Sequence, residues 1–351
     1  MKKILVVETG GTFATCSNSK VRSLSGEDSK KIYDFDIVKD RLKGYELVLD
    51  RERPIYTLSE NMTLENLNIL LEYLENKDFK EYDGVIITHG TDTLSFTSNL
   101  LSLTISDKKV PIVIVSSNHP LTNPKANGVD NFVAAIDFIE NVKATGVFVV
   151  YKNFNGIMEV HLGSRVKQMN QVIDAYESFK NVRFGIMESR SFYINTSKYS
   201  PSLEEVTKNE NTKDIKVNLN KNVILIHPYT GLRYDYFQID ENIDAICCGV
   251  YHSGTVNSQD INIDQSINTL IKRCEKYNIP LFIGELTSGV EVYESIEKIK
   301  ESSIVYPVYD ISLENLYMKI HTGLSITKNN DELYDFINNK NIFFEKIVER
   351  H

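Results

Sequence analysis

The chain has 351 residues, of which 42% are hydrophobic, and at roughly 100–200 residues per domain this length predicts about two domains with buried cores. Its formal net charge is −9 at pH 7, with acidic and basic residues interspersed, which excludes the basic surface expected of a nucleic-acid-binding protein. The four cysteines show no CxxC spacing, so the sequence predicts neither a metal site nor a disulfide framework, and the expected partners are small solutes.

The first residues lead directly into a short apolar segment that ends at Glu8. This segment is too brief for the h-region of a signal peptide, and no small-residue cleavage site follows it. No later apolar stretch approaches the ~20 residues that cross a bilayer. We therefore expect a soluble, cytoplasmic protein with no membrane partner.

Short apolar runs alternate with amphipathic segments in the first half of the chain. Four runs are typical of buried strands: residues 4–7, 85–87, 110–115 and 147–150. Two segments between them carry apolar residues at helical spacing: residues 64–74 and 129–142. This alternation predicts a parallel, doubly wound α/β sheet, whose ligands bind beyond the carboxyl ends of the strands.

The composition becomes polar over residues 188–222, as in a linker. Beyond it the alternation resumes, with strands predicted at 223–226, 243–250, 280–283 and 305–308 and helices at 267–277 and 313–321. The predicted organisation is an N-terminal catalytic α/β domain over residues 1–187, a linker over 188–222, and a smaller C-terminal α/β domain over 223–351.

Two glycine-rich turns follow predicted strands: Thr9-Gly10-Gly11-Thr12 and Thr88-His89-Gly90-Thr91-Asp92-Thr93. Glycine lets backbone amides approach a substrate closely, and a threonine hydroxyl serves either as a nucleophile or as a partner in a turn hydrogen bond. Thr91, Asp92 or Thr93 equally fits the N-cap of the helix that follows. Because both turns lie at carboxyl ends of strands, we expect them to converge on one pocket.

A nucleophilic threonine needs a base, because its alcohol is almost fully protonated at neutral pH, and a desolvated lysine can serve. Thr91 and Asp92 leave the second strand together and suit a bridge between a lysine amine and a substrate ammonium. His89 is a candidate general base. A histidine beside a glycine at a strand end is more often structural, and we therefore interpret His89 as a structural residue.

Taken together, the two turns resemble the signature motifs of the bacterial-type L-asparaginase and glutaminase family, and the layout is closest to the cytoplasmic type I asparaginases. The likeness extends to Ser59-Glu60-Asn61-Met62 and to Ser116-Ser117-Asn118-His119-Pro120. Ala126-Asn127-Gly128 stands where members usually read Ser-Asp-Gly. The resemblance covers the predicted N-terminal domain, and the second domain is similar in layout. It implies the two-domain asparaginase-like fold.

By this resemblance, Thr12 is the primary nucleophile, and Thr91, Asp92 and a lysine form a second cluster. The lysine is assigned as Lys167, because it stands seven residues before Asp174-Ala175-Tyr176, which resembles the Asp-Ala-Phe that follows the family's catalytic lysine. Members usually carry Arg, two residues and then Lys, whereas this chain has only Val166 between Arg165 and Lys167.

The resemblance also assigns the substrate contacts. Ser59, Glu60 and Asp92 are expected to hold the α-carboxylate and α-ammonium groups of an amino acid. Backbone amides from Gly11 to Thr12 or from Gly90 to Thr91 would stabilise the oxyanion. Ser117 would line the amide end of the pocket. The reaction requires no metal and no cofactor.

One family feature is missing: a tyrosine on a mobile loop that closes the pocket and hydrogen-bonds the attacking hydroxyl. No tyrosine occurs between residues 16 and 32, and Leu24 stands at roughly that position. Either another residue activates the nucleophile, or Tyr33 reaches the pocket, or turnover is weak. The polar stretch 17–31 has the composition of a lid, and equally of a plain surface loop.

The leading interpretation is an amidohydrolase that converts L-asparagine to L-aspartate and ammonia through an acyl-Thr12 ester, assembled as a homodimer or homotetramer. L-Glutamine is an alternative substrate, because one methylene in a pocket is worth only ~1–3 kcal/mol. The amidase component of a tRNA-dependent amidotransferase is another alternative, for which we expect an extra module before the first strand, where this sequence has none. A non-catalytic amino acid sensor is a third. A phosphate-binding turn is disfavoured, because neither GxGxxG nor a Walker lysine follows the first strand.

Overall fold

The computed structural model describes residues 2–18, 21–24, 28–213, 215–259 and 261–350, and for residues 14–18, 21–24 and 28–30 it describes the backbone alone. The chain forms two compact units. The first unit contains Met1–Ile215 with Ile342–Phe344 and Glu349–His351, and the second contains Lys216–Asn341 with Glu345–Val348.

Within the described residues, the first unit is built on an eight-stranded sheet of order β10-β9-β8-β7-β6-β5-β1-β4. Its strands are β1 (Lys2–Glu8), β4 (Leu47–Glu52), β5 (Gly84–Thr88), β6 (Pro111–Val115), β7 (Gly146–Lys152), β8 (Met158–Leu162), β9 (Gly185–Glu188) and β10 (Ser191–Ile194). Pairing is parallel from β4 through β7 and antiparallel from β7 through β10. The central parallel strands β5 and β6 are continuous apolar runs because helices cover both of their faces, whereas the edge strand β4 carries charged residues.

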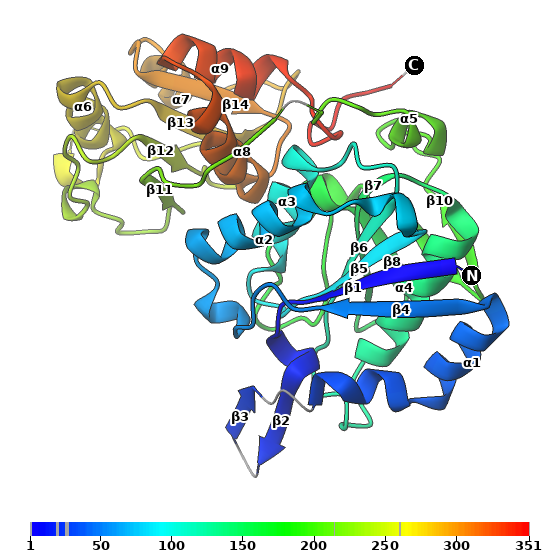
Figure 1. Cartoon of the computed structure of the whole chain (residues 1–351). Coiled ribbons are helices and arrows are strands. Elements are labelled where there is room, and N and C mark those ends of the chain that lie inside the picture. The colour runs from blue at the N-terminus through cyan, green and yellow to red at the C-terminus, as the bar shows by residue number, and fades with distance from the viewer. Residues whose placement is uncertain (1, 19–20, 25–27, 214, 260, 351) are drawn as a thin grey trace. The chain divides into compact units, whose positions relative to one another are not determined.

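Helices α1 (Asp36–Tyr45) and α4 (Gly128–Val142) pack on one face of this sheet, and α2 (Leu64–Asn76) and α3 (Leu94–Thr104) lie on the other (Figure 1). The periodicity that predicted α2 is visible in its buried residues, Leu67, Leu70, Leu71 and Leu74. Thr63 begins α2 with a capping box, in which its hydroxyl accepts from the Asn66 amide.

Shorter elements complete the first unit. They are the hairpin β2 (Thr15–Asn18) and β3 (Val21–Leu24), helix α5 (Leu203–Thr207), and the 3₁₀ helices η1 (Gly11–Ala14), η2 (Asp28–Asp34), η3 (Ser59–Asn61), η4 (Phe79–Glu81), η5 (Gly163–Arg165) and η6 (Phe179–Asn181). Residues 19–20 and 25–27 of the predicted lid lie outside the described residues.

The predicted linker over residues 188–222 is wrong at its N-terminal end. Strand β10 pairs antiparallel with β9, and α5 lies in the same stretch, so residues 188–215 belong to the first unit. Ser202 begins α5 with a second capping box, closed by Glu205. Polar composition here therefore reflects an exposed sheet edge and a short surface helix.

The second unit holds a parallel sheet of order β11-β12-β13-β14 in the part of the chain that is described. Its elements are β11 (Val223–Ile226), β12 (Ala245–Cys248), β13 (Leu281–Leu286), β14 (Val305–Tyr309), α6 (Ile267–Tyr277), α7 (Glu294–Ile299), α8 (Leu313–Ile326), α9 (Asn330–Asn339), η7 (Tyr234–Tyr236) and η8 (Ile263–Gln265). The α/β layout predicted for this half of the chain is confirmed. No helix among the described residues of either unit is long and apolar enough to span a membrane.

Candidate active site

The two glycine-rich turns are neighbours because the strands that carry them are paired. Strand β1 pairs in parallel with β5, with Glu8 opposite Thr88. Directly beyond this register, the Thr9 amide donates to the Thr88 carbonyl at 3.1 Å, and the Thr9 hydroxyl donates to the same oxygen at 2.9 Å. The two turns therefore lie side by side at the carboxyl edge of the sheet, as expected, and the pocket that they are expected to share stays a prediction.

Gly11 and Gly90 let the two turns touch through their backbones. Gly11 has a φ of 66°, and a Cβ atom there would lie 2.3 Å from the Gly90 nitrogen. A Cβ atom on Gly90 would lie 2.5 Å from the Ser59 hydroxyl oxygen. These are distances that real side chains do not tolerate, so glycine is required at both positions.

The Gly11 amide is already occupied. It donates to the Thr57 carbonyl at 3.0 Å, and the Thr57 amide in turn donates to the Thr9 carbonyl at 3.0 Å. This amide holds the chain before η3 against the turn after β1, so it is not available to an oxyanion in this conformation, and the expected oxyanion role of the Thr12, Gly90 and Thr91 amides stays a prediction.

Ser59 connects this chain segment to the turn after β5. Its buried hydroxyl donates to Asp92 Oδ2 at 2.6 Å, and its carbonyl accepts from the Thr93 hydroxyl at 2.9 Å. Thr93 occupies the N-cap position of α3 without making a side-chain capping bond. The prediction that Thr93 caps α3 with its side chain is therefore wrong. Asp92 accepts the Ser59 hydrogen bond and is otherwise exposed. Glu60, the next residue, is exposed.

Thr12 and Lys167 lie in different parts of the chain, Thr12 in η1 and Lys167 in the loop that follows η5. Thr12 is half-buried in η1, directly after Gly11. Lys167 is half-buried, its amide donates to the Glu177 carbonyl at 2.9 Å, and its ammonium lies 5.7 Å from the centroid of the Phe179 ring. The catalytic roles assigned to Thr12, Thr91 and Lys167 stay predictions.

His89 is structural, as its position predicts. The ring is fully buried, with Nδ1 2.8 Å from the Gly90 carbonyl and Nε2 3.0 Å from the Thr97 hydroxyl. Because a carbonyl only accepts, Nδ1 carries the proton and Nε2 accepts from Thr97. Burial lowers the pKa of His89 to about 4, so the ring is neutral at pH 7 and is fixed as a link between β5 and α3.

Ser117 is fully buried, and its hydroxyl donates to the His119 carbonyl at 2.6 Å. Its predicted role in lining the pocket would require this bond to open. Beside it, Asn118 and Asn127 each donate a backbone amide to the other's side-chain oxygen at 3.0 Å. This reciprocal pair fixes the end of β6 to the start of α4. The sequence did not predict this pair of hydrogen bonds, because its only trace there is two asparagines near the predicted ends of a strand and a helix.

Tyr33 does not provide the missing loop tyrosine. Its hydroxyl donates to Glu8 Oε1 at 3.2 Å, and its ring lies 4.2 Å from the Arg51 guanidinium. The buried Glu8 carboxylate also binds Arg51 at 2.5 Å and Arg53 at 2.6 Å. Tyr33 thus belongs to a charged cluster that ties the end of β1 to the edge strand β4. Leu24, the other residue considered, has no described side chain.

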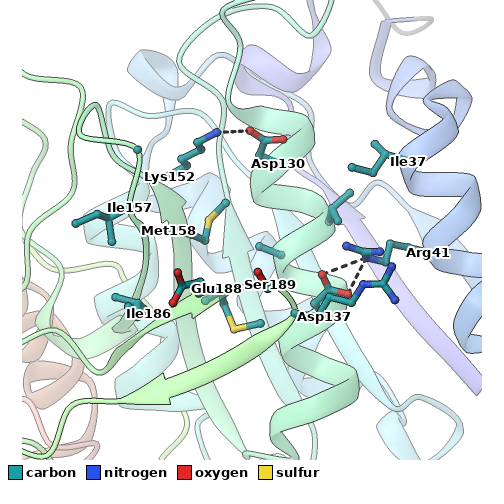
Figure 2. Close-up of a pocket in the computed structure, with 15 residues that line it drawn as sticks. Ile37, Arg41, Asp130, Asp137, Lys152, Ile157, Met158, Ile186, Glu188 and Ser189 are labelled. Atoms are coloured by element: carbon teal, nitrogen blue, oxygen red, sulfur yellow. Dashed lines mark hydrogen bonds and ion pairs between the residues drawn. The ribbon is translucent and has the colours of Figure 1, made fainter.

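A cavity of about 470 Å³ lies elsewhere on the first unit, between α1, α4, β8 and β9. Figure 2 shows two ion pairs at this cavity, Lys152 with Asp130 at 2.7 Å and Arg41 with Asp137 at 2.8 Å. Its other labelled residues are Ile37, Ile157, Met158, Ile186, Glu188 and Ser189. None of the predicted site residues lines it, so the cavity and the chemistry predicted from the sequence are separate features.

Within the described ranges, no three His, Cys, Asp or Glu side chains gather as a metal site would require. The predicted site residues supply hydroxyls, carboxylates, one ammonium and backbone amides. Such a set suits a zwitterionic amino acid, whose charged groups need partners of both signs.

Comparison with known proteins gives matches along nearly the whole chain. L-asparaginase from Thermococcus kodakarensis is 23% identical over 337 residues, which cover 94% of this chain and 95% of that protein. A Glutamyl-tRNA(Gln) amidotransferase subunit from Methanosphaera stadtmanae is 24% identical over 349 residues, covering 96% of this chain and 75% of that protein.

Solved structures share the fold. The thermostable L-asparaginase from Thermococcus kodakarensis superposes with a TM-score of 0.75 at 21% identity, covering 99% of this chain and 100% of that one. L-asparaginase I from Vibrio cholerae gives a TM-score of 0.75 at 16% identity, with 99% of each chain covered. The family model described as Asparaginase, N-terminal matches residues 3–199, which is more than half of the sequence. The chain therefore belongs to the asparaginase family of amidohydrolases.

Proposed function

We propose that this chain hydrolyses the side-chain amide of L-asparagine to L-aspartate and ammonia, with Thr12 as the nucleophile. The convergence of the two turns carries the proposal, because the Gly11 backbone lies against Gly90 while Ser59 bonds Asp92. This convergence supports a single site in which a hydroxyl nucleophile faces a second hydroxyl and a carboxylate across two adjacent strand ends.

In the proposed reaction, the Thr12 hydroxyl oxygen attacks the carbonyl carbon of the substrate side chain, and its proton passes to the cluster of Thr91, Asp92 and Lys167. The C–N bond breaks, the cluster delivers the proton to the leaving nitrogen, and ammonia departs from an acyl-threonine ester. Water then attacks the ester, which releases L-aspartate and restores the hydroxyl. Because the Gly11 amide is engaged, we assign the oxyanion to backbone amides of the Gly90–Thr91 turn.

Ser59, Glu60 and Asp92 are proposed to hold the α-groups of the substrate. The Ser59 hydroxyl and the exposed Asp92 carboxylate already lie within hydrogen-bond distance, so each is oriented before a ligand arrives. Such pre-orientation reduces the entropy that binding costs. Glu60 is exposed and is free to meet an ammonium group.

A second candidate is favoured by the comparison with the Glutamyl-tRNA(Gln) amidotransferase protein of Methanosphaera stadtmanae, which matches 96% of this chain. In that case the same site would release ammonia from an amide donor for use by a partner protein. A non-catalytic sensor is the third, and it is favoured by the engagement of the Tyr33 hydroxyl with Glu8.

The test is ammonia release by the purified chain with L-asparagine and with L-glutamine, beside Thr12→Ala. We expect release with L-asparagine and a loss of at least about 10³-fold in kcat for Thr12→Ala. Thr145→Ala is the matched control, because its hydroxyl donates to the Thr207 carbonyl at 2.9 Å away from the two turns. Release only in the presence of a partner and tRNA would favour the amidotransferase, and ligand binding without release would favour the sensor.

A further inference from the structure

Tyr176 joins two parts of the proposed site that are far apart in the sequence. Its side chain is fully buried, and its hydroxyl donates to the Thr91 carbonyl at 2.7 Å. Burial raises the pKa of Tyr176 well above its usual value, so the hydroxyl stays protonated and remains a donor across the working pH range. This is a direct bond from a buried side chain to the backbone of a proposed catalytic residue.

The position of Tyr176 is fixed by its own neighbours. Its amide donates to Asn153 Oδ1 at 3.0 Å, and its carbonyl accepts from Asn153 Nδ2 at 3.0 Å. Its ring meets the Tyr151 ring edge-on, with centroids 5.0 Å apart. Tyr151 in turn donates to the Asp174 carboxylate. One side chain therefore clamps the Tyr176 backbone from both sides, and a second ring sets the direction of its hydroxyl.

The segment that carries Tyr176 also holds the backbone of Lys167. The Lys167 amide donates to the Glu177 carbonyl at 2.9 Å, and Val166 forms an isolated bridge with Ser178. On the other side, Asn99 of α3 donates to the Val166 carbonyl at 2.9 Å. The backbone of residues 166–167 is thus hydrogen-bonded to residues 177–178 on one side and to helix α3 on the other.

We propose that Tyr176 is a positioning residue, whose hydroxyl sets the separation between the Thr91 turn and the segment that carries Lys167. This inference rests on the proposed function. Without the hydroxyl, the Thr91 carbonyl loses its buried donor, and the turn is released from the strip that anchors Lys167. Because Ser59 and Asp92 are joined to each other independently of Tyr176, substrate binding depends on it much less than proton transfer does.

The test is Tyr176→Phe, which removes one oxygen and leaves the ring. We expect kcat for L-asparagine to fall about 10- to 100-fold, as for a misplacement near 1 Å, while KM changes by less than about threefold. The pH profile of kcat should shift as well, because it reports the cluster that holds the proton. Tyr73→Phe is the matched control, because its hydroxyl donates to Glu52 Oε2 at 2.6 Å in a bond away from the site, and it should leave both constants and the profile unchanged.

Asn153→Asp gives a second route, because it keeps the acceptor for the Tyr176 amide and loses the donor to its carbonyl. It should lower kcat in the same direction, and it decides the matter if Tyr176→Phe does not fold. If the unmodified chain is active and both variants match Tyr73→Phe, the positioning role is wrong and the proposed function stands. If the unmodified chain releases no ammonia from either amide, the proposed function is wrong and this inference falls with it.

Discussion

Substitution of Gly11 by alanine tests the close approach of the two turns. Both Gly11, with φ 66°, and Gly156, with φ 82°, adopt left-handed backbone conformations, so alanine at either position costs about 1–2 kcal/mol in backbone strain. The two sites differ in their surroundings. A Cβ atom at Gly156 meets nothing within 4 Å, whereas one at Gly11 lies 2.3 Å from the Gly90 nitrogen and 2.4 Å from its Cα.

The extra cost at Gly11 follows from that overlap. Ordinary contact begins near 3.4 Å, so the turns must separate by about 1 Å, and such overpacking costs typically about 1–3 kcal/mol. Gly11→Ala should therefore lower the free energy of unfolding by about 2–5 kcal/mol, against about 1–2 kcal/mol for Gly156→Ala. Because the separation moves the nucleophile turn against the Thr91 turn, kcat should fall about 100-fold in Gly11→Ala alone.

Urea unfolding followed by circular dichroism gives the stability difference, and steady-state ammonia release gives kcat. Gly156→Ala serves as the control for backbone strain in the same unit of the chain. Equal unfolding midpoints and equal kcat values for the two variants would refute the reasoning, because they would mean that the Gly11 and Gly90 backbones do not touch.

Three further predictions follow from other contacts. Ser59→Ala removes the donor to Asp92, so KM for L-asparagine should rise about tenfold with a smaller change in kcat; an unchanged KM in steady-state ammonia release would contradict the assignment. Glu8→Gln removes the carboxylate charge shared by two arginines, and the free energy of unfolding should fall by about 2–3 kcal/mol; an unchanged urea midpoint would show that the cluster contributes nothing. Burial lowers the pKa of His89 to about 4 and of His161 to about 3, so below pH 6.5 the unfolded chain takes up protons that the folded chain refuses. The free energy of unfolding should therefore be highest above pH 6.5 and should fall by about 2 kcal/mol per histidine by pH 5. Equal urea midpoints at pH 7.5 and pH 5 would refute this.

The strands that the sequence predicted in the first unit are the central ones, which are buried on both faces. Runs such as 85–87 and 110–115 are continuous and apolar because helices cover them on both sides, so composition alone marks them. Strand β10 has only four residues, with exposed and half-buried side chains alternating at a sheet edge. Its sequence, Ser191–Ile194, contains two aromatic residues and an isoleucine, but four residues within a polar stretch are too short a run to predict a strand, and its pairing with β9 establishes it.

In the candidate site, the sequence predicts where the two glycine-rich turns lie but not the hydrogen bonds that fix their positions. The glycines of both turns can be recognised in the sequence, because glycine that follows an apolar run is typical of a turn at a strand end. The bond from Tyr176 to Thr91 joins positions 85 residues apart, and the bond from the Gly11 amide to Thr57 depends on a bridge that no local pattern encodes. Glu8 did carry a signal, because a carboxylate at the end of a buried strand requires a charged partner.

The pairing of β1 with β5 also has a consequence for the order of folding. It joins residues such as Thr9 and Thr88, which lie 79 positions apart, so the strands meet only after a long loop of chain has closed. Local elements such as α2 form from neighbouring residues and need no such event. We expect the nucleophile turn to acquire its geometry late, in the same cooperative step that aligns these strands. A partly folded intermediate would then hold most of the helices and no working site.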